Sequence, residues 1–209
     1  AEMVVKTLEK NGVKVVFGYP GAANCPIIDK LSFSSIKHIL TRNEQGAAHM
    51  ASGYARVTKQ AGVCTATSGP GATNLITGIA TAYMDSIPMV ALTGQVATKL
   101  IGKDAFQEVD ITGATLPFTK HSYLIKDGLD IPRVVNEAFH IANTGRPGPV
   151  LIDFPMDLLK KEFDYPDEDE DVNIRGYKLM GKANESQVKK VAEAIKGAKK
   201  PVILAGGGV

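Results

Sequence analysis

The feature that most constrains the fold is a repeated alternation of short β-rich runs with helical patterns. Several of the runs are apolar almost throughout, which is typical of strands covered on both faces. The clearest helix is expected at 131–144, where apolar side chains share one face. We expect six strands, at residues 13–17, 36–40, 62–66, 89–92, 119–125 and 150–154. This alternation predicts an α/β fold with a mostly parallel six-stranded sheet and helices on both faces.

The character of the sequence changes after residue 163. Residues 164–184 are polar and contain an acidic run at 167–171, which we interpret as a solvated stretch of a linker. An amphipathic helix and then a strand-like run, PVILAGGGV, follow. We therefore expect one domain at 1–163, a linker at 164–184 and the truncated start of a second α/β domain at 185–209.

The composition argues against several kinds of function. Lys and Arg number 24 against 22 Asp and Glu, with no long basic run, so no nucleic-acid partner is expected. No stretch approaches the about 18 apolar residues of a membrane span. The four histidines are scattered, so we expect no protein-ligated metal. Cys25 and Cys64 lack CxxC spacing and are interpreted as buried, reduced thiols of a cytoplasmic protein.

Three loops follow the first three expected strands, where parallel α/β sheets keep their sites. They read FGYPGAAN (17–24), TRNEQG (41–46) and ATSGPGATN (66–74). The Gly-Pro-Gly segment would let a ligand approach a helix N-terminus closely, although it is equally good chemistry for an ordinary turn. It matches neither the dinucleotide nor the P-loop fingerprint. A fourth loop, at 92–113, is too long for a simple turn, and such loops are more often functional.

Glu44 stands at the entrance of an expected helix that is otherwise rich in small residues. The ordinary explanation is a first-turn acid that faces water and is favoured by the helix dipole. Ala47, Ala51 and Ala55 lie at i, i+4 and i+8, so one helix face could instead approach another backbone closely. The residues alone leave both interpretations open.

Six longer motifs carry a resemblance to a known family. They read FGYPG, RNEQGAAHMASGYAR, SGPGATNLITGIATAYMDSIPMVALTGQV, IGKDAFQEVDITG, TKHSYLI and GRPGPVLIDFPMD. Their order and spacing resemble the catalytic subunit of acetolactate synthase (acetohydroxyacid synthase), a thiamine-diphosphate enzyme of branched-chain amino-acid biosynthesis. Residues 1–163 resemble its pyrimidine-binding domain, and residues 185–209 resemble the start of its central, FAD-associated domain.

The resemblance implies a role for Glu44, which matches the glutamate that shares a proton with N1′ of the cofactor's aminopyrimidine. We expect such a carboxyl to be buried, and in this family the backbone that meets the small helix face belongs to a second subunit. Gln107 matches an active-site glutamine near the reacting carbon. The other matched cofactor contacts are Tyr19, Pro20, Pro70, Asn74 and, for FAD, Arg146. Arg146 could instead anchor its Gly-Pro loop through an ion pair.

Three positions match the substrate and inhibitor channel of the family. Lys120 matches a position associated with inhibitor binding. Ala97 stands where plant and yeast members have Pro, and Met156 stands where they have Lys. We expect weaker attraction for anionic inhibitors, and for the substrate, than in those relatives.

The resemblance implies a transferase that decarboxylates pyruvate and joins the remaining two-carbon unit to a second 2-keto acid, with thiamine diphosphate, Mg²⁺ and FAD as cofactors. A related thiamine-dependent decarboxylase would release an aldehyde instead. No GDG motif occurs, so we expect the diphosphate and Mg²⁺ site outside these residues and negligible activity from this chain alone, which could be only a binding and dimerisation module. The implied partners are further copies, in a homodimer or homotetramer with the active site across the interface, and a small regulatory subunit.

Overall fold

The structure is a computed structural model of the chain, and it describes residues 1–164, 172–179 and 181–208. Two compact units are present, Ala1–Ile174 and Arg175–Val209. The acidic run at 167–171, which we interpreted as part of a linker, lies outside the described residues.

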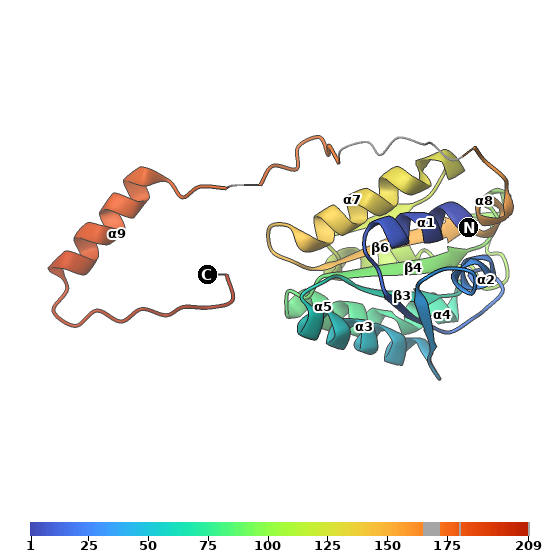
Figure 1. Cartoon of the computed structure of the whole chain (residues 1–209), viewed down its shortest axis with the longest axis horizontal. Coiled ribbons are helices and arrows are strands. Elements are labelled where there is room, and N and C mark those ends of the chain that lie inside the picture. Colours follow the sequence, from blue (N-terminus) through green and yellow to red (C-terminus); the bar gives the residue numbers. More distant parts are fainter. Residues whose placement is uncertain (165–171, 180, 209) are drawn as a thin grey trace. The chain divides into compact units, whose positions relative to one another are not determined.

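The first unit is built around a sheet of six parallel strands in the order β2-β1-β3-β4-β6-β5 (Figure 1). The strands are β1 (Val15–Gly18), β2 (Lys37–Leu40), β3 (Gly62–Ala66), β4 (Met89–Gln95), β5 (His121–Leu124) and β6 (Pro149–Pro155). The expected α/β fold is confirmed. Because the chain passes from β1 to β2 on one side and then to β3 on the other, the strand order reverses between β1 and β3. Open α/β sheets bind ligands beside such a reversal, at the carboxyl ends of the strands.

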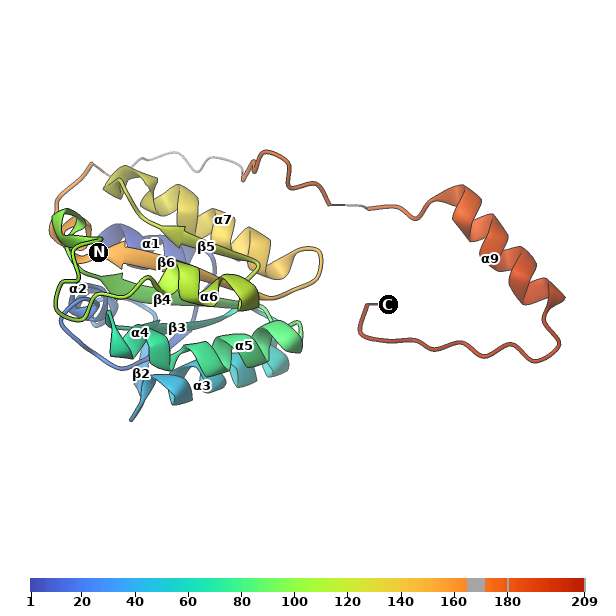
Figure 2. The ribbon, with the colours of Figure 1, turned by 180° about the vertical axis from the view of Figure 1, so that it is seen from behind.

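Helices cover both faces of this sheet (Figures 1 and 2). One face carries α1 (Glu2–Lys10), α2 (Cys25–Leu31) and α7 (Ile131–Asn143). The other carries α3 (Glu44–Thr58), α4 (Pro70–Asn74), α5 (Ile76–Met84) and α6 (Ile111–Thr115). The remaining short helices are η1 (Thr98–Leu100), η2 (Leu116–Phe118), η3 (Gly128–Asp130) and α8 (Met156–Lys160).

Two apolar layers form the core, one on each face of the sheet. Strands β3, β4 and β6 are buried along their whole length, as their continuous apolar character predicts. The expected apolar stripe of α7 is also buried. Strand β4 is three residues longer than expected, because its pairing with β6 continues through Gln95 and Pro155.

The small residues of α3 are buried within this chain. Ala47, Ala51 and Ala55 pack beside β3, where a Cβ atom on Gly62 would collide with the Ala51 carbonyl group. The expectation that this helix face meets a second subunit is therefore wrong. Because β3 follows α3 directly in the chain, the helix packs on this strand, and the small side chains of α3 allow the two backbones to approach closely.

The second unit contains α9 (Glu185–Gly197), whose N-terminus is capped by Asn184. The side-chain oxygen of Asn184 accepts hydrogen bonds from the backbone N–H groups of Ser186 (3.0 Å) and Gln187 (3.3 Å). The strand expected after this helix is not formed by residues 201–208, and its apolar side chains are exposed. A strand needs a neighbour for its backbone hydrogen bonds, and the described residues of this unit include no other strand. In the parts of the chain described here, every helix is too short or too polar to cross a membrane.

Candidate functional site

The parallel strands deliver most of the predicted site residues to one edge of the sheet. Loops that follow β1, β2, β3, β4 and β6 all begin at this carboxyl edge. The predicted residues that lie on these loops, or on helices that begin there, are Tyr19, Pro20, Glu44, Pro70, Asn74, Ala97, Gln107 and Met156. Lys120 and Arg146 come just before β5 and β6, so they lie at the opposite, amino edge.

Glu44 begins α3 and is buried, with 9% of its surface exposed. The preceding residue, Asn43, caps the helix by accepting a hydrogen bond from the Gly46 N–H at 2.7 Å. Glu44 Oε2 accepts a hydrogen bond of 3.0 Å from Asn74 Nδ2. Expected burial is thus confirmed, and the alternative of a first-turn acid that faces water is wrong.

The other carboxylate oxygen of Glu44 is turned toward the Gly-Pro-Gly segment. A Cβ atom on Gly71 would lie 3.3 Å from Glu44 Oε1. Within the described residues, Oε1 accepts no hydrogen bond, whereas Oε2 is held by Asn74. One oxygen is therefore fixed by the protein, and the other remains available to a ligand.

Thr67 joins the first and third loops beside the reversal of strand order. Its Oγ1 accepts a hydrogen bond of 3.1 Å from the Ala23 N–H, and its side chain fills the space in front of Gly21 and Gly71. Asn24, which is fully buried, holds the first loop by accepting from the Gly21 N–H (2.7 Å) and donating to the Tyr19 carbonyl (3.1 Å). Tyr19 itself is 43% exposed, so its ring is free to contact a ligand.

The long loop after β4 brings Gln107 to the Gly-Pro-Gly segment. Gln107 has a backbone φ of 57°, which is uncommon for a residue with a side chain. A Cβ atom on Gly69, whose φ is 59°, would lie 2.6 Å from the Gln107 carbonyl oxygen, so only glycine fits there. Such backbone conformations concentrate at functional sites. The predicted catalytic residues Glu44 and Gln107 thus flank the same turn.

Glu108 closes the loop that presents Gln107. Its carboxylate accepts hydrogen bonds from the backbone N–H groups of Gly102 and Ala105, the latter at 2.8 Å. These backbone donors lower the pKa of Glu108. The loop is consequently ordered by its own residues as well as by the sheet.

Two of the predicted channel positions, Ala97 and Met156, lie on segments that hydrogen bonds link. Thr98, next to Ala97, donates from its N–H to Asp157 Oδ1 (2.9 Å) and from its hydroxyl to Oδ2 (2.6 Å). Asp157 follows Met156 at the start of α8. The predicted channel positions Ala97 and Met156 therefore lie on segments that are joined directly.

Lys120 and Arg146 bind backbone groups at the amino edge. Lys120 Nζ donates to the carbonyl groups of Ile141 and Thr144, the latter at 2.6 Å, at the C-terminus of α7. Arg146 donates to Ser86 Oγ (2.8 Å) and to the Tyr83 carbonyl (3.1 Å), and lies over the Tyr83 ring. Its anchor is thus made of hydrogen bonds, with no ion pair among the described residues. Neither side chain is brought to Glu44, and the roles implied for both remain predictions.

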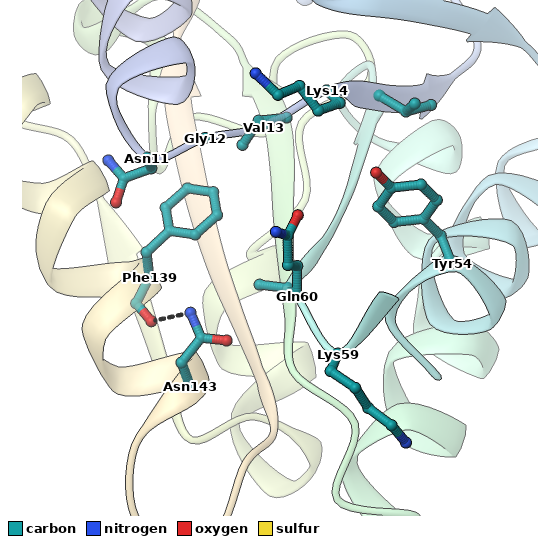
Figure 3. A pocket seen from close by; sticks show the side chains of 11 residues that line it. Asn11, Gly12, Val13, Lys14, Tyr54, Lys59, Gln60, Phe139 and Asn143 are labelled. Carbon is teal, nitrogen blue, oxygen red and sulfur yellow. Dashed lines mark hydrogen bonds between the residues drawn. The ribbon is translucent and has the colours of Figure 1, made fainter. Parts of the chain in front are cut away.

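A cavity of about 310 Å³ also lies at the amino edge, between α1, α3 and α7. Figure 3 shows Phe139 and Tyr54 on either side of Gln60 within it. Its lining residues are Asn11, Gly12, Val13, Lys14, Val15, Tyr54, Lys59, Gln60, Ala61, Phe139 and Asn143. None of the predicted site residues belongs to this set. The candidate site is therefore distinct from the cavity.

Several polar residues that matter here escaped the sequence-based prediction. Asn24, Thr67 and Asp153 were not singled out, although Asp153 is a lone acid inside the apolar strand VLIDF. Thr41 Oγ1 is buried and has no hydrogen-bond partner among the described residues. A polar residue within an otherwise apolar, buried run is the signal that could have identified Asp153.

The prediction for the cysteines is half correct. Cys64 is buried in β3, and burial raises the pKa of its thiol to about 12. Cys25 is exposed, contrary to expectation, because it begins α2 on the solvent side of that helix. Both are free thiols.

Comparison with known proteins decides the family. The profile described as "Thiamine pyrophosphate enzyme, N-terminal TPP binding domain" matches residues 1–114. The chain belongs to the thiamine pyrophosphate enzymes. Its matched domain begins with α1 and contains Glu44, the Gly-Pro-Gly segment and Gln107.

Curated relatives are similar over the whole chain. A "Probable acetolactate synthase large subunit" of Methanocaldococcus jannaschii is 56% identical over 212 residues, which cover 100% of this chain and 36% of the relative. An "Acetolactate synthase" of Mycobacterium bovis is 55% identical, over 100% of this chain and 34% of the relative. An "Acetolactate synthase large subunit" of Buchnera aphidicola is 53% identical, over 100% and 37%. The chain spans about a third of the length of these curated relatives.

Proposed function

We propose that the full-length protein is the catalytic subunit of an acetolactate synthase. It would decarboxylate pyruvate and condense the two-carbon unit with a second 2-keto acid, in the first common step of branched-chain amino-acid biosynthesis. The names of relatives that match the entire chain at more than 50% identity support this activity. The chemistry of the carboxyl edge supports it independently.

The buried Glu44–Asn74 pair is the observation that carries the proposal. Asn74 holds Oε2, which leaves Oε1 of Glu44 to exchange a proton with the aminopyrimidine of the cofactor. When bound, thiamine diphosphate supplies the electron sink that permits cleavage beside a keto group. Tyr19, Pro20 and Pro70 would line the pyrimidine, and Gln107 would face the substrate.

The proposal includes two further cofactors and a cellular location. Mg²⁺ would be held with the diphosphate by residues outside this chain. FAD would be contacted by Arg146: its Nε and Nη2 donate hydrogen bonds to Ser86, Tyr83 and Met84, whereas its Nη1 donates none within the described residues. A cytoplasmic location is consistent with the two free thiols.

A second copy of the protein is the partner we propose, with the active site at the interface and with a small regulatory subunit as an additional partner. The outer face of α3 supports a protein partner because it exposes Met50 (48%) and Val57 (84%). Between them, Gly53 has open space around its Cα, so another backbone could approach there. The site itself opens at the start of the same helix.

Kinetics of Glu44→Gln in the full-length protein test the proposal. Pyruvate, thiamine diphosphate and Mg²⁺ are supplied, and acetolactate is followed by its conversion to acetoin in acid. We expect acetolactate from the parent and a loss of about 10²-fold or more in the variant, the scale of acid–base catalysis. Free acetaldehyde from the parent would instead identify a decarboxylase.

A matched control keeps the charge but moves it by one residue. Gln45 is exposed and adjacent, so Glu44→Gln combined with Gln45→Glu retains a first-turn acid outside the buried position. This double variant should be as inactive as Glu44→Gln. Recovery of activity would show that Glu44 acts only through the helix dipole, and the proposed proton transfer would be rejected.

A further inference from the structure

The loop that carries Gln107 is attached near both of its ends to the β6–α8 segment, directly at one end and through Gln95 at the other. We define the Gln107 loop as residues 96–110, between β4 and α6. Near its beginning, Thr98 is bound by Asp157 of α8, at 2.9 and 2.6 Å. Near its end, the Val109 carbonyl accepts a hydrogen bond of 2.8 Å from Gln95 Nε2. Gln95 in turn is bound by Asp153 of β6.

Both ends of the Gln95 side-chain amide are hydrogen-bonded, and together these bonds fix its orientation. Its Nε2 donates to both Asp153 Oδ2 and the Val109 carbonyl, each at 2.8 Å. Its Oε1 accepts from the Val96 N–H, also at 2.8 Å. If the amide turned over, two donors would face each other at Val96 and two acceptors at Val109. The amide therefore has one favourable orientation.

The network is buried, so each of its polar groups needs a hydrogen-bond partner within the protein. Gln95 is 4% exposed, Asp153 is 1% exposed and Thr93, which donates to Asp153 Oδ1 at 2.7 Å, is fully buried. An unpaired polar group in such surroundings costs about 1–3 kcal/mol. A structural role for the network alone would explain its burial. It would not explain why Gln95 Nε2 also donates a hydrogen bond to the Val109 carbonyl in the loop.

The held end of the loop is two residues from Gln107. Gln107 has a left-handed backbone conformation, and its carbonyl and Cα lie against Gly69. A displacement of Val109 would therefore move Gln107 relative to the Gly-Pro-Gly segment. Catalytic groups displaced by about 1 Å can lose as much as 10²-fold in rate.

We propose that Gln95 is a positioning residue of the reaction: its amide, oriented by Asp153 and by the Val96 N–H, holds the Val109 carbonyl and so sets the place of Gln107. This inference rests on the proposed function, because Gln107 has a substrate to act on only if the protein catalyses that reaction. Among the described residues the hydrogen bonds of the Gln95 side chain go to Val109, Asp153 and Val96 and not to Glu44 or Gln107, so its effect is exerted through the loop.

Two substitutions in the full-length enzyme test the proposal. Asp153→Asn combined with Gln95→Glu exchanges the polarity of the pair without a change in net charge. The new carboxylate can accept from the Val96 N–H and from the new amide, and the oxygen of that amide can still accept from Thr93. However, an ionised carboxylate cannot donate to the Val109 carbonyl and is repelled by it, so at a pH where this group is ionised the attachment of the loop is lost.

Asp153→Asn alone is the matched control. Its amide can turn its oxygen to Gln95 and its nitrogen to Thr93 Oγ1, which can accept, so the bond from Gln95 to Val109 is retained. We expect this control to keep kcat within about threefold of the parent. For the exchanged pair we expect kcat to fall by about 10- to 100-fold, with a smaller change in the KM for pyruvate.

Hydrogen exchange supplies a readout that does not depend on activity. The amides of the Gln107 loop, followed by mass spectrometry, should exchange faster in the exchanged pair and at the parent rate in the control. If the exchanged pair does not fold, Gln95→Met removes the bond to Val109 while Thr93 remains bound to Asp153, and the same two changes are expected.

Two results would overturn the inference. The first is an unchanged kcat and unchanged exchange when the bond to Val109 is removed. The second is an equal loss of kcat in the control, since the charge of Asp153 would then matter instead of the orientation of Gln95. A parent enzyme that forms no acetolactate would refute the proposed function, whereas the exchange experiment would still decide whether Gln95 holds the loop.

Discussion

At the scale of single residues, Asp153 makes the stability of the first unit depend on pH. Burial raises the pKa of this carboxyl to about 7, against the hydrogen bonds from Thr93 and Gln95, and the charge of Asp110 adds to the rise. Its ordinary value is 3.8, so the folded state binds the proton more tightly than the unfolded state. The stability that this proton contributes is therefore complete below about pH 4 and is lost as the pH rises through about 7.

We predict that Asp153→Asn removes this dependence. The interval between 3.8 and about 7 corresponds to at most about 4 kcal/mol. Urea unfolding at pH 5 and at pH 8 measures it: the parent should lose stability relative to the variant between these two values. A difference between parent and variant that is the same at both pH values would contradict the prediction.

The sequence identified the members of the site better than their contacts. Glu44 and Asn74 were each predicted, and the structure joins them across 30 positions of the chain. Burial of Glu44 followed from the resemblance, whereas composition and spacing left it open. Asp153 was missed because its partners, Thr93 and Gln95, lie on another strand, and strand register cannot be derived from local pattern.

At the scale of elements, the contact between α3 and α5 predicts opposite effects for two glycines. A Cβ atom on Gly78 of α5 would collide with the side chain of Ala48 of α3, whereas Gly53 of α3 has no atom within 4 Å. We expect Gly78→Ala to destabilise the chain by about 1–3 kcal/mol through overpacking. Gly53→Ala should stabilise it by about 0.5–1 kcal/mol, because alanine favours the helix.

Urea unfolding of the chain, at a concentration where it is monomeric, measures both effects, and each variant is the control for the other. Equal effects of the two substitutions would show that α3 and α5 do not touch at Gly78. Loss of stability on Gly53→Ala in the monomer would contradict the open space around that residue.

Lys120 tests whether a predicted channel residue is instead an element of the fold. Its ammonium group binds two carbonyl groups at the C-terminus of α7, where a positive charge also complements the helix dipole. We predict that Lys120→Met lowers the free energy of unfolding by about 1–2 kcal/mol, with little change in the KM for pyruvate. Lys120→Arg, which keeps the charge and the donors, is the control.

The two roles of Lys120 are separable in one set of measurements. An unchanged melting temperature together with a weakened affinity for an anionic inhibitor would favour the channel role and contradict the helix-capping role. Thermal unfolding and inhibition are therefore to be measured on the same preparations of the full-length protein.

The secondary structure was predictable because its signals are local. The strands and α7 followed from apolar runs and helical periodicity, and their existence is confirmed. The neighbour of the small face of α3 was predicted wrongly, because a small face shows that something comes close without showing what does. The apolar run after α9 was predicted as a strand on composition, but pairing decides strand formation.

At the scale of the whole molecule, the exposed face of α3 predicts self-association. Met50 and Val57 would each be covered by a second copy, so a charge there should oppose association. We predict that Val57→Asp shifts the full-length protein toward monomer in light scattering, and that its specific activity falls on dilution. Phe33→Asp, at an equally exposed apolar residue after α2, is the control and should behave as the parent.

A variant Val57→Asp that associates as the parent does would exclude this face from the interface.

Fold class could be predicted at this scale, since alternating elements allow few arrangements other than a parallel sheet. The strand order could not, because it depends on which side of β1 each later strand joins. The opening of the site beside β1 and β3 depends on that order.

The position of β6 has a practical consequence for anyone who wishes to isolate this domain. The matched family profile ends at residue 114, yet β6 pairs with β4 along seven residues and provides Asp153, which orients Gln95. The helix that follows β6, α8, provides Asp157, which binds Thr98 of the Gln107 loop. A protein cut at residue 114 would leave β4 as a bare, apolar edge, which invites aggregation. It would also remove Asp157, the partner of Thr98, and Asp153, the partner of Gln95. An isolated domain that keeps these contacts must therefore extend at least through α8.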